Sequence, residues 1–249
     1  MAGHSQFKNI MHRKGAQDKK RSKLFTRLLR EILVAAKISP DPEHNPRLRT
    51  AILAAREANL PKDKIQNTIA KASNPAEGEN FEEIRYEGYA PGGIAIIVEA
   101  LTDNRNRTAS EVRSSFTKFG GQLGETGSVS FLFKHIGSIS YPTKTASFEQ
   151  IFDATIEAGA DDCVNDNDNY EIICSIENFH NVRDFLDNKF GAASSAEITW
   201  KPNANQLLSV EEGEKLLKLL DALDECDDVQ NVFGNFELPD ALLQKLKND

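Results

Sequence analysis

The 249-residue sequence has few of the residues that metal sites and disulfides require. Its three cysteines, Cys163, Cys174 and Cys226, include no pair at Cys-x-x-Cys spacing. Its five histidines form neither a His-x-x-x-His nor a His-Glu-x-x-His pattern, so we expect no structural zinc site. An odd, sparse set of cysteines is typical of a reducing compartment, in which disulfides rarely persist.

Long apolar runs are also missing. No stretch approaches the roughly 20 apolar residues that a membrane helix needs. Residues 1–5 lack the apolar centre of a secretory signal peptide. These absences predict a cytoplasmic protein that has no membrane partner.

Catalytic motifs are equally scarce. Serine, histidine, cysteine and carboxylate residues show no motif spacing for nucleophilic or acid–base catalysis. The turn at Pro91-Gly92-Gly93 lacks the Gly-Lys-Ser/Thr ending of a phosphate loop, and residues 165–168 lack the glycine and glutamate of a calcium loop. The sequence therefore predicts a protein that is not an enzyme and has no cofactor. An enzyme with a site around residues 103–107 is the alternative.

Charge is distributed very unevenly along the chain. The net charge is −8, yet residues 1–75 contain 16 lysines and arginines against 6 acids, whereas the rest contains 14 against 32. Such asymmetry suggests a polyanion-binding head on an acidic body. The alternative is that the two parts pair with each other, since opposite charges attract within a molecule too.

The apolar pattern predicts a bundle of three amphipathic helices at the start of the chain. One helix covers residues 23–37, the second begins after Asn45 with Pro46 at its first position, and the third follows the turn at Asn59-Leu60-Pro61. Residues 74–80 are expected to be a linker.

The rest of the chain alternates between strand and helix patterns. We expect strands at 84–87, 94–101 and 129–133, and a helix opened by a capping box at Thr108-Ala109-Ser110-Glu111. Residues 136–200 follow the order β-α-β-β-α-β of ferredoxin-like units. A helix at 210–223 and a strand at 229–233 would return to the preceding sheet. The predicted fold is α+β and multi-domain: a helical bundle at 1–76, an α/β domain at 77–134 plus 207–249, and a ferredoxin-like domain inserted at 135–206.

The candidate nucleic-acid site is the basic stretch of residues 8–30. A helix would place Lys20, Lys23, Arg27 and Arg30 on one face, a stripe that suits a phosphate backbone. Neutral hydrogen-bond donors at residues 4–12 could fix the register of the protein on the nucleic acid. The alternatives are a solvated basic face and a membrane-surface helix. The predicted contacts in this stretch are His4, Ser5, Lys8, Asn9, His12, Arg13, Lys14, Lys19, Lys20, Arg21, Lys23, Arg27 and Arg30.

Two further features could contact nucleic acid. The turn at residues 59–61 is compatible with a helix-turn-helix whose second helix shows lysines and amides, although any helical bundle has such a turn. Arg105 and Arg107 lie between a strand and a helix N-terminus, where anions bind favourably. The alternative for these arginines is a capped connector in which they pair with acids.

Several motifs resemble the YebC/PmpR family. They cover essentially the whole chain, and they include His12-Arg13-Lys14, Lys23-Leu24-Phe25-Thr26-Arg27, Asn45-Pro46-Arg47-Leu48-Arg49, Tyr86-Glu87-Gly88-Tyr89-Ala90-Pro91-Gly92-Gly93, Leu101-Thr102-Asp103-Asn104-Arg105-Asn106-Arg107-Thr108 and Gly127-Ser128-Val129. The family often has Lys-Trp where this chain has Gln6-Phe7, and a basic run at Gln66-Asn67-Thr68.

The resemblance implies a three-domain protein with the ferredoxin-like domain inserted into the second. It implies a DNA-binding regulator of transcription that is not an enzyme. Relatives that include a mitochondrial translational activator imply the alternative of a ribosome-associated factor that relieves stalling at proline-rich stretches. The expected partner is therefore DNA, or ribosomal RNA and the ribosome, bound by a monomer or weak homodimer.

Overall fold

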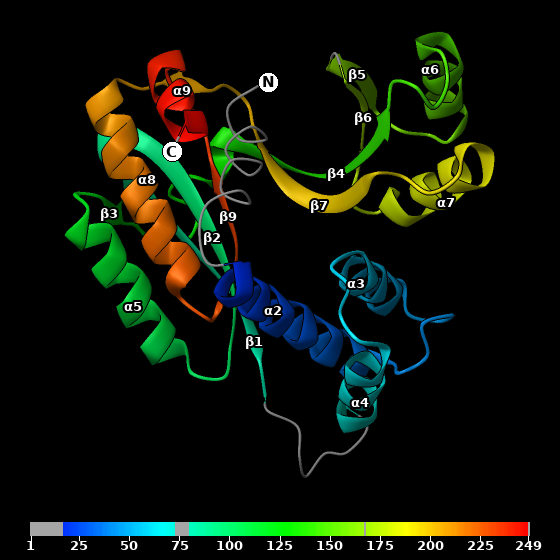
Figure 1. The fold of residues 1–249 in the computed structure, drawn as a ribbon, viewed down its shortest axis with the longest axis horizontal. Coiled ribbons are helices and arrows are strands. Elements are labelled where there is room, and N and C mark those ends of the chain that lie inside the picture. Colours follow the sequence, from blue (N-terminus) through cyan, green and yellow to red (C-terminus); the bar gives the residue numbers. More distant parts are fainter. Residues whose placement is uncertain (1–16, 73–79, 167, 249) are drawn as a thin grey trace. The chain divides into compact units, whose positions relative to one another are not determined.

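The computed structural model describes residues 17–72, 80–166 and 168–248 (Figure 1). It is an α+β protein with two four-stranded sheets and a two-stranded one in these ranges. Residues 131–204 form one compact unit, and the residues on both sides of them form the other. The predicted boundaries after residues 76, 134 and 206 stay predictions. None of the described helices combines the length and apolarity needed to cross a membrane.

The first three described helices pack as the predicted bundle. They are α2 (Gln17–Ile38), α3 (Pro46–Glu57) and α4 (Lys62–Ala72). Ile32, Leu48 and Ile65 supply one apolar residue from each helix to a shared core. The carboxamide oxygen of Asn45 accepts the N–H of Leu48 at 3.0 Å, so α3 begins where the Asn-Pro step predicts.

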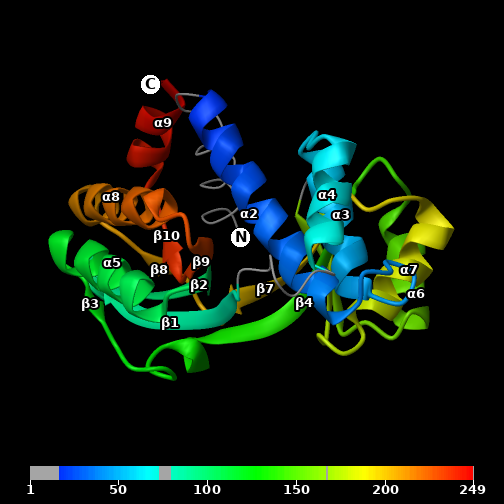
Figure 2. The ribbon, with the colours of Figure 1, turned by 90° about the horizontal axis from the view of Figure 1, so that it is seen from below.

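The second part of this unit is an antiparallel sheet in the order β3-β1-β2-β9. Its strands are β1 (Glu82–Ala90), β2 (Ile94–Thr102), β3 (Gln122–Leu123) and β9 (Val229–Gly234). Helices α5 (Arg105–Lys118) and α8 (Val210–Glu225) cover one face, as Figure 2 shows. The late strand β9 pairs with β2, which confirms the expected return of the chain. A 3-10 turn, η1 (Pro91–Gly93), joins β1 to β2, and β8 (Gln206–Leu207), β10 (Phe236–Glu237) and α9 (Asp240–Asn248) complete the unit.

Two predictions in this region are wrong. The α5 helix begins at Arg105 with Asn104 as its N-cap, whose side chain accepts the N–H of Arg107 at 3.1 Å. The proposed cap Thr108 therefore lies inside the helix. The strand expected at 129–133 is instead a 3-10 turn, η2 (Ser130–Leu132), followed by strand β4.

The unit of residues 131–204 has the predicted β-α-β-β-α-β order. Its elements are β4 (Phe133–Pro142), α6 (Phe148–Glu157), β5 (Asp162–Asp166), β6 (Asn169–Cys174), α7 (Phe179–Phe190) and β7 (Ser195–Pro202). The antiparallel strands lie in the order β5-β6-β4-β7, and residues from α6 and α7 complete their core. This arrangement confirms the ferredoxin-like prediction.

Candidate nucleic-acid interface

The structure describes only part of the predicted basic site. The predicted contacts His4, Ser5, Lys8, Asn9, His12, Arg13 and Lys14 lie outside the described residues. Lys19 and Lys20 lie in the first turn of α2, and their side chains are outside the description too. The guanidinium of Arg21 lies 5.2 Å from the ring centre of Phe25, and this arginine is exposed.

The next two cations of α2 contact the end of α8. Lys23 donates to the backbone carbonyl of Glu225 at 2.9 Å. Arg27 is bidentate on Asp224, with its Nη1 2.8 Å from the carboxylate and its Nη2 2.8 Å from the carbonyl oxygen. The alternative in which basic and acidic parts of the chain pair with each other is therefore observed for these two residues. Whether they also contact nucleic acid stays a prediction.

The partner of α2 is an acidic segment, residues 224–228, which contains four acids: Asp224, Glu225, Asp227 and Asp228. The segment begins in the last turn of α8 and continues past its end. The C-terminal end of a helix carries partial negative charge, so acids there repel both it and one another. Cations from α2 relieve this repulsion, which explains why Lys23, Arg27 and Arg30 face this end of α8.

Asp228 is the buried centre of this contact, with only 2% of its surface exposed. Its Oδ1 accepts from Arg30 Nη1 at 2.9 Å, and its Oδ2 accepts from Arg107 Nη2 at 2.6 Å. The hydroxyls of Thr108 and Thr102 lie 2.7 and 3.2 Å from Oδ2. Burial opposes ionisation, but the hydrogen bonds from Arg107 and Thr108 and the charges of both arginines hold the pKa of Asp228 below its usual value.

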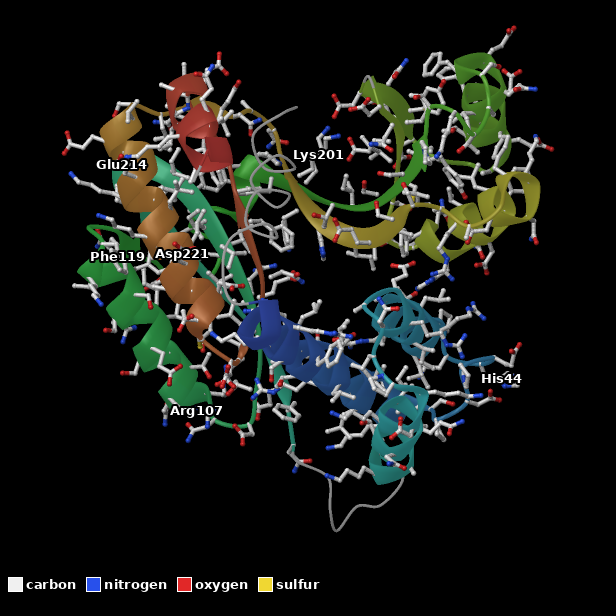
Figure 3. The ribbon with its side chains drawn as sticks, viewed as in Figure 1. His44, Arg107, Phe119, Lys201, Glu214 and Asp221 are labelled. Atoms are coloured by element: carbon white, nitrogen blue, oxygen red, sulfur yellow. The ribbon has the colours of Figure 1, made fainter. Side chains whose placement is uncertain are left out.

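The two arginines predicted at the start of α5 differ in their surroundings. Arg107, labelled in Figure 3, lies near the start of α5. It is held between Asp228 and Asp103, and its carboxylate partners raise its pKa. Arg105 lies 3.6 Å from Glu82, and 69% of its side chain is exposed. The connector alternative, in which arginines pair with acids, describes Arg107 well. Arg105 retains the exposure that a phosphate contact requires.

Helix α4 presents a different cationic surface. Lys62, Lys64, Gln66, Asn67 and Lys71 are all exposed, as the helix-turn-helix alternative requires. Within the described part of the chain, none of the three lysines makes an ion pair. This face therefore combines unpaired positive charge with two amides that can donate and accept hydrogen bonds.

The carboxylate of Glu87, which lies outside the candidate interface, explains the Gly127-Ser128-Val129 motif. Glu87 is 1% exposed, and its Oε2 accepts the N–H groups of Val129 and Ser130, each at 2.9 Å. Burial disfavours its charge, yet these bonds hold the pKa of Glu87 below its usual value. The Gly127-Ser128-Val129 motif therefore serves to wrap the chain around a buried anion.

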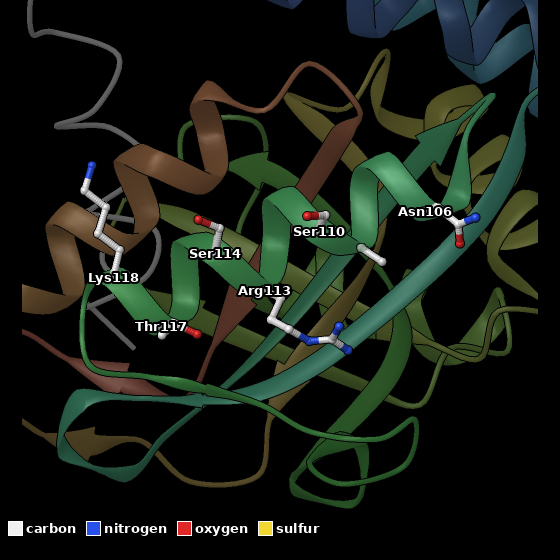
Figure 4. A pocket seen from close by; sticks show the side chains of 7 residues that line it. Asn106, Ser110, Arg113, Ser114, Thr117 and Lys118 are labelled. Carbon is white, nitrogen blue, oxygen red and sulfur yellow. The ribbon is translucent and has the colours of Figure 1, made fainter.

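A depression on the outer face of α5 offers little for a small molecule. Figure 4 shows its lining, which comes from this helix alone: Asn106, Ala109, Ser110, Arg113, Ser114, Thr117 and Lys118. Among the residues that the structure describes, none lines an opposite wall, so a ligand would stay open to water. In the described ranges, histidines, cysteines and carboxylates also form no cluster that could hold a metal ion.

Asp228 and its network are not among the residues that the sequence pattern predicts. The available signal was the run of acids after an amphipathic helix, which conflicts with the helix dipole and so calls for cations. The sequence pattern did not indicate which cations would pair with these acids, because Arg30 and Asp228 are 198 positions apart.

These features define a multi-domain α+β protein with a basic helical bundle and a ferredoxin-like unit. Comparison with protein families identifies it further: the chain belongs to the TACO1/YebC family. Residues 5–75 match the family's domain described as "TACO1/YebC protein N-terminal domain", and residues 81–236 match "TACO1/YebC second and third domain".

Individual relatives are similar over nearly their whole length. A protein of Rickettsia bellii strain OSU 85-389 is 61% identical over 249 residues, which cover 99% of this chain and 97% of the relative. One from strain RML369-C is 60% identical, with 99% and 98% covered. Both are called a probable transcriptional regulatory protein, which supports a regulatory role here. The crystal structure of the conserved hypothetical protein Aq1575 from Aquifex aeolicus has a TM-score of 0.80 and 47% identity, and covers 92% of this chain and 96% of its own.

Proposed function

We propose that the protein regulates gene expression by binding nucleic acid through its basic helical bundle, with duplex DNA as the favoured ligand. The observation that carries this proposal is the exposed face of α4, where Lys62, Lys64 and Lys71 lie unpaired among the described residues. Lysines that neutralise phosphates release condensed counterions, which supplies most of the affinity for a polyanion. The protein acts in the cytoplasm without a cofactor or catalytic step.

The two amides of α4 add a means of selectivity. Gln66 and Asn67 are exposed beside the lysines, and such side chains can bond two groups of an adenine edge in the major groove. The turn before α4 is compact, because Asn59 adopts a left-handed conformation with φ of 58° and Leu60 is buried. Together these features resemble the second helix of a helix-turn-helix.

Two of the α2 cations, Lys23 and Arg27, contribute only by exchange in this proposal. Lys23 and Arg27 already contact the acidic segment, so a phosphate that binds them must displace a carbonyl or carboxylate oxygen. The acidic segment therefore competes with nucleic acid for this part of the surface.

Neutralising the acidic segment is expected to raise affinity. The double variant Asp224→Asn, Glu225→Gln removes two competing negative charges and should bind a 20-base-pair DNA about 3- to 10-fold more tightly, because each pair has a solvent-accessible acid and is worth about 1 kcal/mol or less. Fluorescence anisotropy at 0.1 M salt measures the change. Glu211→Gln, Glu214→Gln removes the same charge from the start of α8 and serves as the control. Equal gains in both variants would contradict the local competition.

One experiment separates DNA from ribosomal RNA as the ligand. The full chain is crosslinked in cells, and its association with genomic DNA is compared with its co-sedimentation with ribosomes. We expect a DNA footprint that is lost when Lys62, Lys64 and Lys71 are replaced by alanine. Ribosome association without any footprint would replace DNA by ribosomal RNA, whose backbone the same lysines can neutralise.

A further inference from the structure

The outer face of α6 carries an apolar stripe. Phe148, Phe152 and Ile156 lie four residues apart, which places them one above another on a helix. Their exposed fractions are 41%, 40% and 62%. The opposite face already fills the core of the 131–204 unit, with Ile151 and Ala154 completely buried. The stripe therefore leaves apolar surface exposed that the core of this unit does not cover.

Aromatic contacts hold the start of this stripe in place. The ring centre of Phe148 lies 5.7 Å from that of Phe152 and 5.8 Å from that of Tyr170 on β6. Tyr170 is buried, so Phe148 packs against the core of the unit, and Phe152 packs against Phe148. A surface that is ordered before binding costs less side-chain entropy when a partner arrives.

A row of acids runs beside the stripe. Glu149, Asp153 and Glu157 each follow one of its apolar residues in sequence, so they form a second line along the same helix. Lys189 pairs with Glu157 at 2.9 Å. Acids also dominate the whole unit, since residues 131–204 contain twelve acids and five lysines and arginines. The charge beside the stripe is therefore negative.

We propose that this α6 face, Phe148, Phe152 and Ile156 with the adjoining acids, docks a basic amphipathic helix of a partner protein. The stripe extends over nine residues, about 12 Å along the axis, which matches the apolar side chains on two turns of a partner helix. Lysines or arginines flanking those side chains would meet the acidic row.

The negative row decides against two other occupants. A second copy of the chain would bring two acidic rows together, and like charges placed side by side disfavour such a contact. An anionic membrane surface would repel the row for the same reason, and interfacial helices usually carry lysine and arginine on the polar face. A basic amphipathic helix can contact both parts of the surface, with its apolar side chains on the stripe and its cations on the acidic row.

The test uses the full chain and a labelled 18-residue peptide of leucine and lysine, with the leucines on one helical face. A second peptide has glutamate in place of lysine. We expect the lysine peptide to bind, Phe152→Ser with Ile156→Ser to weaken it at least 10-fold, and Glu149→Lys with Asp153→Lys to weaken it similarly. The lysine variant should also bind the glutamate peptide more tightly than the native chain does.

Controls make the result specific to α6. Leu207→Ser with Val210→Ser replaces two exposed apolar residues of the other unit and should leave binding unchanged. Fluorescence of Trp200 on β7 verifies that the 131–204 unit of each variant is folded. Equal weakening by the control, or none by the α6 variants, would overturn the proposal. So would a native dimer that the serine variant disperses, or binding to phosphatidylcholine vesicles that this variant abolishes.

Discussion

Replacing Asp228 with asparagine is expected to lower the free energy of unfolding by about 2–3 kcal/mol at pH 7. Removing one partner of a buried ion pair typically costs about 3–5 kcal/mol, because the other charge is left without compensation. The two arginines are only partly buried here, with side-chain exposures of 19% and 43%, so water replaces some of the loss. Asparagine keeps one oxygen that can still accept from Thr108, which limits the effect further.

The neighbouring residue provides a matched control. Asp227 is exposed, and Asp227→Asn removes the same charge from the same segment. It should change stability by less than about 0.5 kcal/mol, as surface substitutions usually do. Denaturant unfolding followed by circular dichroism measures both variants. Trp200, the single tryptophan, lies on β7 and reports on the 131–204 unit, so its transition should stay unchanged in both.

The same variant is expected to alter the pH dependence of stability. The folded pKa of Asp228 lies below its unfolded value, so the carboxylate stabilises the fold fully above about pH 5, and this contribution is lost as pH falls through about 4 and below. The difference in stability between the native chain and Asp228→Asn should therefore shrink on acidification. A difference that stays constant from pH 7 to pH 3 would contradict the role assigned to this charge.

Local signals predicted most helices and strands. The start of α3 depends on two local features, the hydrogen bond from Leu48 N–H to the Asn45 side chain and the fixed backbone angle of Pro46. Both lie within four residues, so the local sequence is enough to predict where the helix begins. The ferredoxin-like order followed from alternating periods in the same way. The predicted start of α5 was wrong because Asn104 and Thr108 are both residue types that favour the N-cap position. The contact of Thr108 with Asp228, 120 residues away, favours its placement inside the helix.

Contacts between residues that are distant in sequence also limited the prediction of the candidate site. Periodicity predicted that Lys23, Arg27 and Arg30 share one face of a helix, and they do. It could not predict that the acidic segment would lie against this face, because the paired residues are about 200 positions apart. The exposure of α4 was easier to anticipate, since Ile65 and Ile69 define its inner side and the lysines fall elsewhere.

Removing three cations from the first turns of α2 is expected to have the largest effect on nucleic-acid affinity. If the native chain neutralises about five phosphates, log K should fall with log salt at a slope of roughly −4 to −5 on duplex DNA. The variant Lys19→Ala, Lys20→Ala, Arg21→Ala should flatten this slope by about 2 to 3. Affinity at 0.1 M salt should then fall roughly 100- to 1,000-fold. Arg21 is exposed beside Phe25 and, unlike Arg27, has no carboxylate to displace in the described part of the chain.

The control for this triple variant removes equal charge elsewhere. Arg113 and Lys118 on α5, together with Lys144, are replaced by alanine, so both proteins lose three positive charges. Charges more than about 10 Å from a phosphate are screened at 0.1 M salt, and we expect the control to weaken binding less than about 3-fold. A titration of both variants against one DNA duplex from 50 to 300 mM salt gives the two slopes. Equal slopes would mean that the net charge of the chain, and not the position of its basic helix, determines how it holds a phosphate backbone.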